Sequence, residues 1–404
     1  MVINMCGYNN VPKIRFKGFT DVWEQRKFGD YGTVSMCKRI FKNETSDNGD
    51  IPFYKIGTFG GKADAFISNE KYEYYKSKFS YPNKGDILLS ASGTIGRIVE
   101  YTGEKAYFQD SNIVWLNHNE DIKNVFLKVL YPTVKWDGIE GSTIKRLYNS
   151  NFLNTCINIP NTLEQEKIGE LFTNLDNLIT LHQRKCDTLV NAKKSLLEKM
   201  FPKNSSNIPE IRFKEFTDVW EQRKLEDIVD FYRGHGLNWN DIDENGINKC
   251  ILYGNLYTDY GMVINNVLRY TNNNKKEYFL SECGDVLIPS SDTTPTGLAR
   301  ASALNLKGII LGGDINVLRP KMINGAFLSY AINNKRNDMI KRIKGTTVRH
   351  LNNSDIKDMI LNIAKDNKEQ ESISNLIMNI DNLITLHQHK ELKRRNDNNE
   401  HLRW

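Results

Sequence analysis

The sequence predicts a mixed α/β (α+β) protein: two globular domains joined and spaced by two long helices in an antiparallel coiled coil, with an internal pseudo-twofold repeat. The first observation is a duplicated segment, IRFKGFTDVWEQRKFGD at Ile14–Asp30 and IRFKEFTDVWEQRKLED at Ile211–Asp227. A second pair matches Asn174–Lys185 with Asn379–Lys390. Both pairs recur after about 200 residues, so the repeated unit has the size of a domain. The stretches between them align only loosely, which predicts two similar frames that carry different inserts.

Composition sets the broad class of the protein. A chain of 404 residues that is 39% hydrophobic can bury more than one core, and its net charge of +6 permits nucleic-acid binding without proving it. The six cysteines are scattered without a Cys-x-x-Cys pair, which is typical of reduced thiols. No secretory signal or membrane-length apolar run is evident, so we expect a soluble, cytoplasmic protein.

Each half ends in a strong helix pattern. Thr162-Leu-Glu-Gln165 has the form of a capping box, and Asp366-Asn-Lys-Glu369 is its counterpart in the second half. Apolar residues then recur at alternating spacings of three and four, which predicts one coiled-coil seam per helix. The predicted seam and partner-interface residues are Ile168, Leu171, Leu175, Leu178, His182, Leu189, Leu196, Ile373, Leu376, Ile380, Leu383 and His387.

A narrow apolar stripe needs a partner, and the twin helix in the same chain is the nearest one. The alternative is that each helix covers only its own domain.

The two helix ends also differ, because the first continues as CDTLVNAKKSLLEKMFPK and the second as HKELKRRNDNNEHLRW. Polar residues around Arg394 replace apolar seam positions, so we expect the second end to be frayed, shortened or altered.

The inserts alternate short β-rich runs with turn clusters and predict two domains of one fold. The strongest predicted strands are Asp86–Ser90, Ile113–Leu116, Val286–Pro289 and Ile315–Leu318. We divide the chain into an extension (1–10), two insert-bearing domains (11–158 and 208–362), a central helix with linker (159–207) and a distal helix with tail (363–404).

Two further pairs align loosely between the inserts: GDILLSASGTIGR with GDVLIPSSDTTPTGLAR, and GSTIKRLYNS with GTTVRHLNNS. The chain resembles the specificity subunit of type I restriction–modification systems. The sharpest parts of this resemblance are the duplicated VPKIRFKGFTDVWEQRK and IPEIRFKEFTDVWEQRK segments, the LHQRK helix with LLEKMFPK, and GDIPFYKIGTF with GDILLSASGTIGR in the first insert. The resemblance covers nearly the whole chain. It implies two target-recognition domains, each reading one half of a split, asymmetric DNA site, and helices that dock two methyltransferase subunits. Restriction/motor subunits would join through the methyltransferases.

Motifs for catalysis are not found in the sequence. There is no Pro-Pro pair for an adenine methyltransferase motif and no G-x-x-x-x-G-K-S/T phosphate loop. We therefore expect no enzyme activity, metal or cofactor in this chain, with S-adenosylmethionine, ATP and Mg on the partner subunits.

Candidate DNA contacts follow from the chemistry of base and phosphate recognition, in which arginine, lysine, amides and hydroxyls predominate. They are Lys38, Arg39, Lys62, Ser92, Thr94, Arg97, Lys145, Arg146, Arg233, His235, Asn238, Ser291, Thr293, Arg300, Arg349 and His350. The pairs Lys145-Arg146 and Arg349-His350 occupy corresponding places with different chemistry, as two half-site readers should. The Gly93–Gly96 turn could cradle a phosphate, although a tight strand connection is the favoured interpretation.

The competing hypothesis is an interaction scaffold, or a degenerate specificity subunit, that binds the methyltransferase without reading DNA. A stand-alone nuclease or methyltransferase is a third possibility that the missing motifs disfavour.

Overall fold

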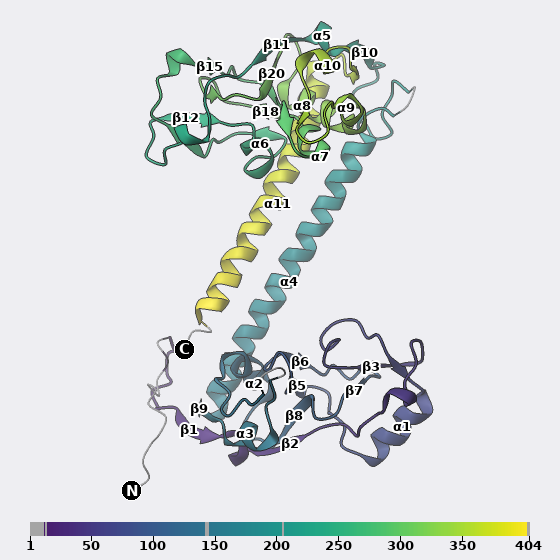
Figure 1. Ribbon diagram of the computed structural model, residues 1–404, viewed down its shortest axis with the longest axis vertical. Helices are drawn as coiled ribbons and strands as arrows, with labels where there is room; N and C mark the ends of the chain where they lie inside the picture. The colour runs from purple at the N-terminus through teal and green to yellow at the C-terminus, as the bar shows by residue number, and fades with distance from the viewer. Residues whose placement is uncertain (1–11, 13, 142–144, 204–205, 402–404) are drawn as a thin grey trace. The chain divides into compact units, whose positions relative to one another are not determined.

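The computed structural model describes all residues except 1–11, 13, 142–144, 204–205 and 402–404, and no side chain at 275 or 389–401 (Figure 1). The expectations for the 1–10 extension and for the polar end around Arg394 therefore lie outside the described residues or side chains. Contacts divide the chain into two compact units: the first comprises residues 1–182 and 389–404, and the second runs from Gln183 to Gln388. Among the described residues, no helix combines the length and apolar composition of a membrane span.

The first unit contains two small sheets and a separate two-stranded ribbon. The main sheet has the order β2 (Gly32–Ser35), β8 (Ile113–His118), β5 (Ile87–Ser90), β6 (Ile98–Glu100). The second sheet has the order β4 (Phe66–Ile67), β3 (Ile51–Tyr54), β7 (Tyr107–Phe108), and the ribbon pairs β1 (Glu24–Lys27) with β9 (Cys156–Ile159). The helices are η1 (Phe28–Asp30), η2 (Lys42–Glu44), α1 (Asn69–Lys78), α2 (Asn124–Leu130), η3 (Tyr131–Thr133), α3 (Asn149–Asn154) and α4 (Thr162–Lys199), of which α4 ends in the second unit.

The second unit repeats this arrangement with additions. Its main sheet has the order β11 (Val229–Arg233), β20 (Ile315–Pro320), β16 (Asp285–Pro289), β18 (Ser302–Leu304), β13 (Val263–Ile264). The other sheet has the order β14 (Arg269–Thr271), β12 (Asn248–Ile251), β19 (Ile310–Leu311), β15 (Phe279–Leu280), and two ribbons pair β10 (Glu221–Lys224) with β22 (Ile360–Ile363) and β17 (Ser291–Asp292) with β21 (Arg349–His350). The helices are α5 (Leu225–Ile228), η4 (Trp239–Asp241), α6 (Asn255–Thr258), η5 (Lys275–Glu277), α7 (Pro295–Leu298), α8 (Gly325–Asn334), α9 (Arg336–Arg342), α10 (Asn353–Ile356) and α11 (Asn367–His401).

The central strand of each main sheet is buried on both faces. In the first unit, Ile87 and Leu89 of β5 enter a core shared with α2 and the start of α4, whereas Leu88 enters the core beside the second sheet. In the second unit, Val286 and Leu287 of β16 divide in the same way. The sequence of a strand that is buried on both faces is a nearly continuous run of apolar residues. The predictions of strands at β5, β8, β16 and β20 are therefore confirmed.

A bidentate ion pair joins the duplicated N-terminal segment to the first turn of each long helix. In the first unit, Arg15 Nε and Nη2 each donate to Glu164 at 2.7 Å. In the second unit, Arg212 makes the same pair with Glu369 at 2.7 and 2.8 Å. Both carboxylate side chains are only 1% exposed, and the hydrogen bond to Glu369 raises the pKa of Arg212 above its ordinary value. Each helix start is thus held by the same charged contact.

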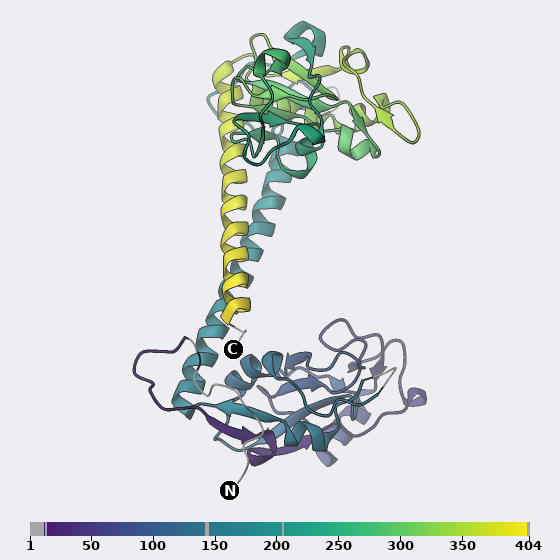
Figure 2. The same ribbon diagram turned by 60° about the vertical axis from the view of Figure 1, so that its left-hand side comes forward.

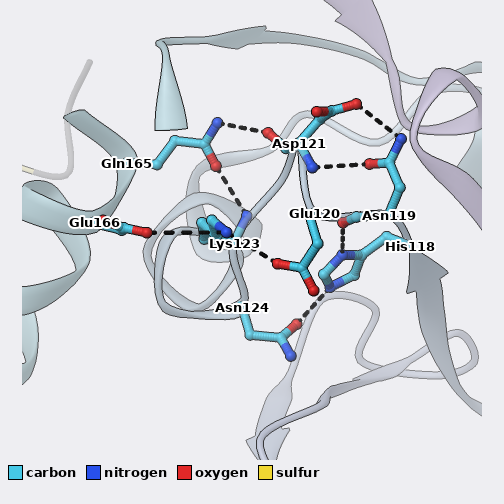
Figure 3. Close-up of polar contacts among 8 residues, drawn as sticks. All are labelled: His118, Asn119, Glu120, Asp121, Lys123, Asn124, Gln165 and Glu166. Atoms are coloured by element: carbon cyan, nitrogen blue, oxygen red, sulfur yellow. Dashed lines mark hydrogen bonds and ion pairs between the residues drawn. The ribbon is translucent and has the colours of Figure 1, made fainter. Parts of the chain in front are cut away.

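The capping box predicted at Thr162–Gln165 is wrong. Asn161 is the cap residue, because its Oδ1 accepts the Glu164 N–H at 3.0 Å. Figure 3 shows the Gln165 amide turned to the loop after β8, where it accepts the Lys123 N–H and donates to the Asp121 carbonyl, both at 2.9 Å. Gln165 therefore fixes this loop to the helix. Sequence spacing could not reveal this, because the loop lies far away in the chain.

The cap predicted in the second half is partly confirmed. Asp366 Oδ1 accepts the Lys368 N–H at 2.8 Å, as a cap residue does. Glu369 does not turn back to the cap but bonds Arg212 instead. The neighbouring Gln370 repeats the role of Gln165, since it accepts the Asn324 N–H at 2.9 Å.

The two long helices run antiparallel within the second unit (Figures 1 and 2). Lys193 Nζ of α4 bonds the Asp381 carboxylate of α11 at 2.6 and 2.8 Å. Further along α4, Leu196 packs into the core that contains Ile373 and Ile377, which precede Asp381 in α11. The pairing prediction thus holds in this segment. The alternative holds at the start of α4, where Ile168 packs into the core of its own unit.

The predicted seam is interrupted. Among its residues, Ile168, Ile373 and Ile380 are buried; Leu175, His182, Leu189, Leu196, Leu376 and His387 are half-buried; Leu171, Leu178 and Leu383 remain 42%, 39% and 45% exposed. Cys186, outside the predicted set, is 8% exposed. A strict heptad pattern drifts around a helix of 3.6 residues per turn, so a seam drawn from sequence loses register with the buried face.

We predict that Glu369→Gln lowers the free energy of unfolding by about 3 kcal/mol, because it leaves a part-buried Arg212 without its counter-charge. Urea unfolding followed by tryptophan fluorescence measures the change. The matched control is Glu221→Gln, which alters an exposed carboxylate paired with Arg223 and Lys365 and should leave the transition nearly unchanged. Equal shifts in the two variants would contradict the structural role of the buried pair.

Candidate nucleic-acid interface

The turn after β5 and the segment before α3 meet in the first unit. Ser92 and Arg146 form an antiparallel backbone bridge. On either side of it, the Gly93 N–H donates to the Lys145 carbonyl at 2.9 Å, and the Leu147 N–H donates to the Ala91 carbonyl at 2.8 Å. Ser92 is buried, whereas Lys145 and Arg146 are exposed. Three of the predicted DNA contacts therefore lie close together, and two of them, Lys145 and Arg146, are exposed.

The second unit builds the same contact from its own residues. Ser291 pairs with His350, and Asp292 pairs with Arg349, in the β17–β21 ribbon. The Leu351 N–H donates to the Ser290 carbonyl at 3.0 Å, as Leu147 does to Ala91. Arg146 and His350 therefore occupy equivalent positions, as the sequence alignment predicts.

The side chains at these equivalent positions have different surroundings. Arg146 makes no side-chain hydrogen bond with the described residues and bridges Glu140 through its backbone. His350 bridges Lys344 in the same way, and its Nδ1 lies 3.0 Å from Ser291 Oγ. Because Nδ1 is engaged, Nε2 is the ring nitrogen left for a ligand. One position thus presents a guanidinium beside an acidic residue, and the other an imidazole beside a basic residue.

Arginines at or beyond the end of the first strand of each main sheet are paired with acidic residues. Arg39 Nε bonds Asp110 at 2.8 Å, and Arg233 Nη2 bonds Asp314 at 2.9 Å and Ser290 Oγ at 3.3 Å. The two arginine side chains remain 58% and 53% exposed. Arg233 therefore lies beside the Ser291–His350 contact, with part of its guanidinium still accessible. Lys38 lies over the Phe79 ring, 5.2 Å from its centroid.

The remaining candidates on loops are mostly exposed. Thr94 lies in the turn after β5, and Thr293 Oγ1 donates to the Asp292 carboxylate at 3.3 Å. His235 and Asn238 lie on the loop that leaves β11, where Asn238 Oδ1 caps η4 by accepting the Asn240 N–H at 2.9 Å. Asn238 therefore acts as a helix cap, and its residue type alone does not distinguish this role from base recognition.

The Gly93–Gly96 segment is a tight turn, as the favoured interpretation predicts. Gly93 and Gly96 adopt φ values of +69° and +89°. Their N–H groups donate within the unit, to Lys145 and to the Ser90 carbonyl at 3.1 Å. These two donors are therefore committed to the fold.

Arg97 and Arg300 are equivalent but differ in accessibility. Arg97 Nη1 donates to the Phe59 carbonyl and Arg300 Nη2 to the Tyr260 carbonyl, both at 3.1 Å. Arg97 is exposed and lines a pocket of about 310 Å³ together with Lys62. Arg300 is half-buried, and burial, followed by the nearby Arg336, lowers its pKa. The structure therefore favours Arg97 over Arg300 as a phosphate contact.

The chain matches one protein family in both halves. The sequence profile described as "Type I restriction modification DNA specificity domain" matches residues 20–191 and again 217–394. The chain belongs to this family. The two matches to one domain profile agree with the internal repeat in the sequence and with the similar sheet orders of the two units.

Individual relatives agree with this assignment. A Haemophilus influenzae protein named as a type I restriction enzyme specificity subunit is 56% identical over 158 residues, which is 38% of this chain and 41% of that protein. The match thus spans less than half of that relative's length. The MjaVIII type I specificity subunit of Methanocaldococcus jannaschii is 23% identical over 332 residues, or 75% of this chain and 71% of the relative.

Solved structures share the fold of this type I specificity protein. The crystal structure of the type I S subunit from M. genitalium gives a TM-score of 0.58 at 16% identity, covering 97% of this chain and 98% of that one. A chain from a study of type I complex assembly and conformational transition gives 0.51 at 14% identity, covering 94% and 96%. The fold predicted from the sequence is therefore confirmed.

Sequence reasoning missed two sets of contacts in this family member, one in the candidate interface and one at the starts of the long helices. It did not predict that Glu140 pairs with Arg146 or that Lys344 pairs with His350. These are backbone bridges between loops whose sequences differ in the two halves. It also overlooked the Arg15–Glu164 and Arg212–Glu369 pairs, although all four residues are identical between the repeats. No group of three or more His, Cys, Asp or Glu side chains suited to a metal ion occurs in the described part of the chain.

Proposed function

We propose that each unit reads one half of a split, asymmetric DNA site and that the chain acts as the non-catalytic specificity subunit of a type I complex. The observation that carries the proposal is the equivalent backbone setting of Arg146 and His350, which present different chemistry. Arginine suits bidentate recognition of guanine O6 and N7, whereas an imidazole offers a single nitrogen. Two readers with one scaffold and different side chains should recognise different half-sites.

The partners of the chain follow from family membership. We propose that the long helices dock two methyltransferase subunits, through which restriction/motor subunits join. S-adenosylmethionine, ATP and Mg would act on those partners, and the complex would work in the cytoplasm. Support for helix docking comes from the apolar side chains of Leu383 and Leu386, which remain 45% and 47% exposed on α11, and of Val190, 47% exposed on α4.

The test of DNA recognition is to co-express the chain with a cognate methyltransferase subunit and map N6-methyladenine across the host genome by single-molecule sequencing. A split, asymmetric motif that needs both proteins is the expected result. Two proteins that co-purify without methylating any motif would instead support the scaffold alternative. Methylation or cleavage by the purified single chain would contradict the non-catalytic role.

We predict that Arg146→Ala relaxes sequence preference in one half-site and His350→Ala in the other. Loss of a good bidentate base contact removes about 1–3 kcal/mol of discrimination, so the effect of Arg146→Ala should be the larger. Methylation mapping or competition binding with half-site variants measures it. Arg26→Ala and Arg223→Ala are matched controls, because these arginines lie in the duplicated strands β1 and β10. Relaxation of both half-sites by one variant would contradict independent reading.

We predict that Leu383→Glu weakens methyltransferase docking about 30-fold, because a charge replaces an apolar contact at the proposed interface. Co-purification and a binding titration with the methyltransferase measure the loss. Ile247→Glu is the control, since Ile247 is 85% exposed in the same unit and lies outside the helices. Similar losses in both variants would indicate a general effect of added charge and refute docking at this position.

A further inference from the structure

The loop after β3 lines an open pocket beside Arg97. Its sequence is Gly57-Thr-Phe-Gly-Gly-Lys62, and the pocket of about 310 Å³ is lined by these six residues and Arg97. Phe59 anchors the loop, because its side chain is 2% exposed in the core and its carbonyl accepts from Arg97. The backbone of the loop is therefore held against the main part of the unit.

Glycines give the loop its shape. Gly60 has a φ of +77°, and a Cβ atom there would lie 3.2 Å from Val99 Cγ2. At Gly57, a Cβ atom would have no neighbour within 4 Å. The loop can thus bring its backbone close to a ligand without side chains in the way.

Hydrogen-bond donors of this loop remain unused. The Thr58 and Gly61 N–H groups donate to the Lys55 and Thr58 carbonyls at 3.0 and 2.9 Å. Within the described residues, the N–H groups of Gly57, Phe59, Gly60 and Lys62 have no acceptor. Backbone N–H groups of a glycine-rich turn are a common setting for anion binding.

The charge of the pocket is positive. Among the described residues, Lys62 forms no ion pair, and the Arg97 side chain hydrogen-bonds only to the Phe59 carbonyl. The nearby Asp64 is paired with Lys55 at 2.8 Å. Two unpaired cations and free N–H groups suit a phosphate, and the buried Phe59 ring offers no exposed surface on which a base could stack.

The second unit lacks this arrangement. Counting from the paired strands β3 and β12, Gly57 corresponds to Gly254 and Phe59 to the buried Leu256. In place of Gly60 and Lys62 stand Tyr257 and Asp259, and Asp259 is paired with Arg269 at 3.0 Å. The same scaffold position is thus cationic and open in one unit, and acidic and already paired in the other.

We propose that the Gly57–Lys62 loop and Arg97 bind a phosphodiester of the DNA backbone next to the half-site read by the first unit, and that the second unit has no equivalent contact. The inference rests on the proposed DNA-reading function. Arg97 ends the same β5–β6 connection that carries Ser92 and Gly93, so the phosphate would lie beside the bases near Arg146. The contact would position the duplex without adding sequence information.

The test uses the full chain in complex with a cognate methyltransferase. The DNA is a duplex that contains the sequence motif identified by methylation mapping. We expect Lys62→Ala to reduce the slope of log affinity against log salt by about 0.9, so that affinity falls about 3.5-fold less between about 50 and 200 mM salt. The recognised motif should not change. Lys62→Arg should restore the slope, and Lys78→Ala, which removes an exposed lysine of α1, should leave it as in the wild type.

A duplex series with single neutral methylphosphonates identifies the phosphate. One position flanking the first half-site should weaken the wild-type complex and leave Lys62→Ala unaffected. Specific wild-type binding with an unchanged slope in Lys62→Ala would overturn this inference alone, whereas wild-type failure to bind any duplex would overturn the proposed function with it. Thermal stabilisation by inorganic phosphate that depends on Lys62, without a change in DNA slope, would show a site for free phosphate and also refute the proposal.

Discussion

The buried Arg–Glu pair at the start of each long helix is the contact on which the rest of the architecture depends. Glu164 and Glu369 lie in the first helical turn, where the helix dipole favours a negative charge, and each receives two charge-assisted hydrogen bonds. A carboxylate so buried is tolerated only with its partner in place. The arginine comes from the duplicated N-terminal segment, so this contact joins the beginning and the end of each domain. The adjacent glutamines then attach the loop or helix start that follows the main sheet.

Because these contacts fix the repeated framework of each unit, the sequences of the loops beside each main sheet can differ between the units. The backbone contacts around Arg146 and His350 are the same in both units, and they involve atoms that every residue type has. Side chains can therefore change without disturbing the scaffold. In the proposed function, the Gly57–Lys62 loop would extend this principle from base recognition to the phosphate backbone, because its counterpart keeps the buried apolar anchor but loses the cationic residue.

Most of the fold could be predicted from the sequence, but less of the candidate interface. Lys145, Arg146, Arg349 and His350 were found because short motifs around them align between the halves. Arg300 and Asn238 were chosen by residue type, which does not show that one is half-buried against a carbonyl and the other caps a short helix. The exposed Leu171 and Leu178 in the predicted seam show the same limit, since a heptad pattern does not specify which turns of a helix meet a partner.

The duplication, the buried strands, the two long helices and the resemblance to the type I specificity family can all be predicted from the sequence alone. These features follow from local periodicity and from motifs repeated along the chain. The three-dimensional contacts were needed to show that Gln165 holds a loop, that Ser92 pairs with Arg146, and that Lys62 and Arg97 line one pocket. These contacts join residues that are distant along the chain, and their geometry depends on how the strands pack and on which backbone donors the fold leaves free.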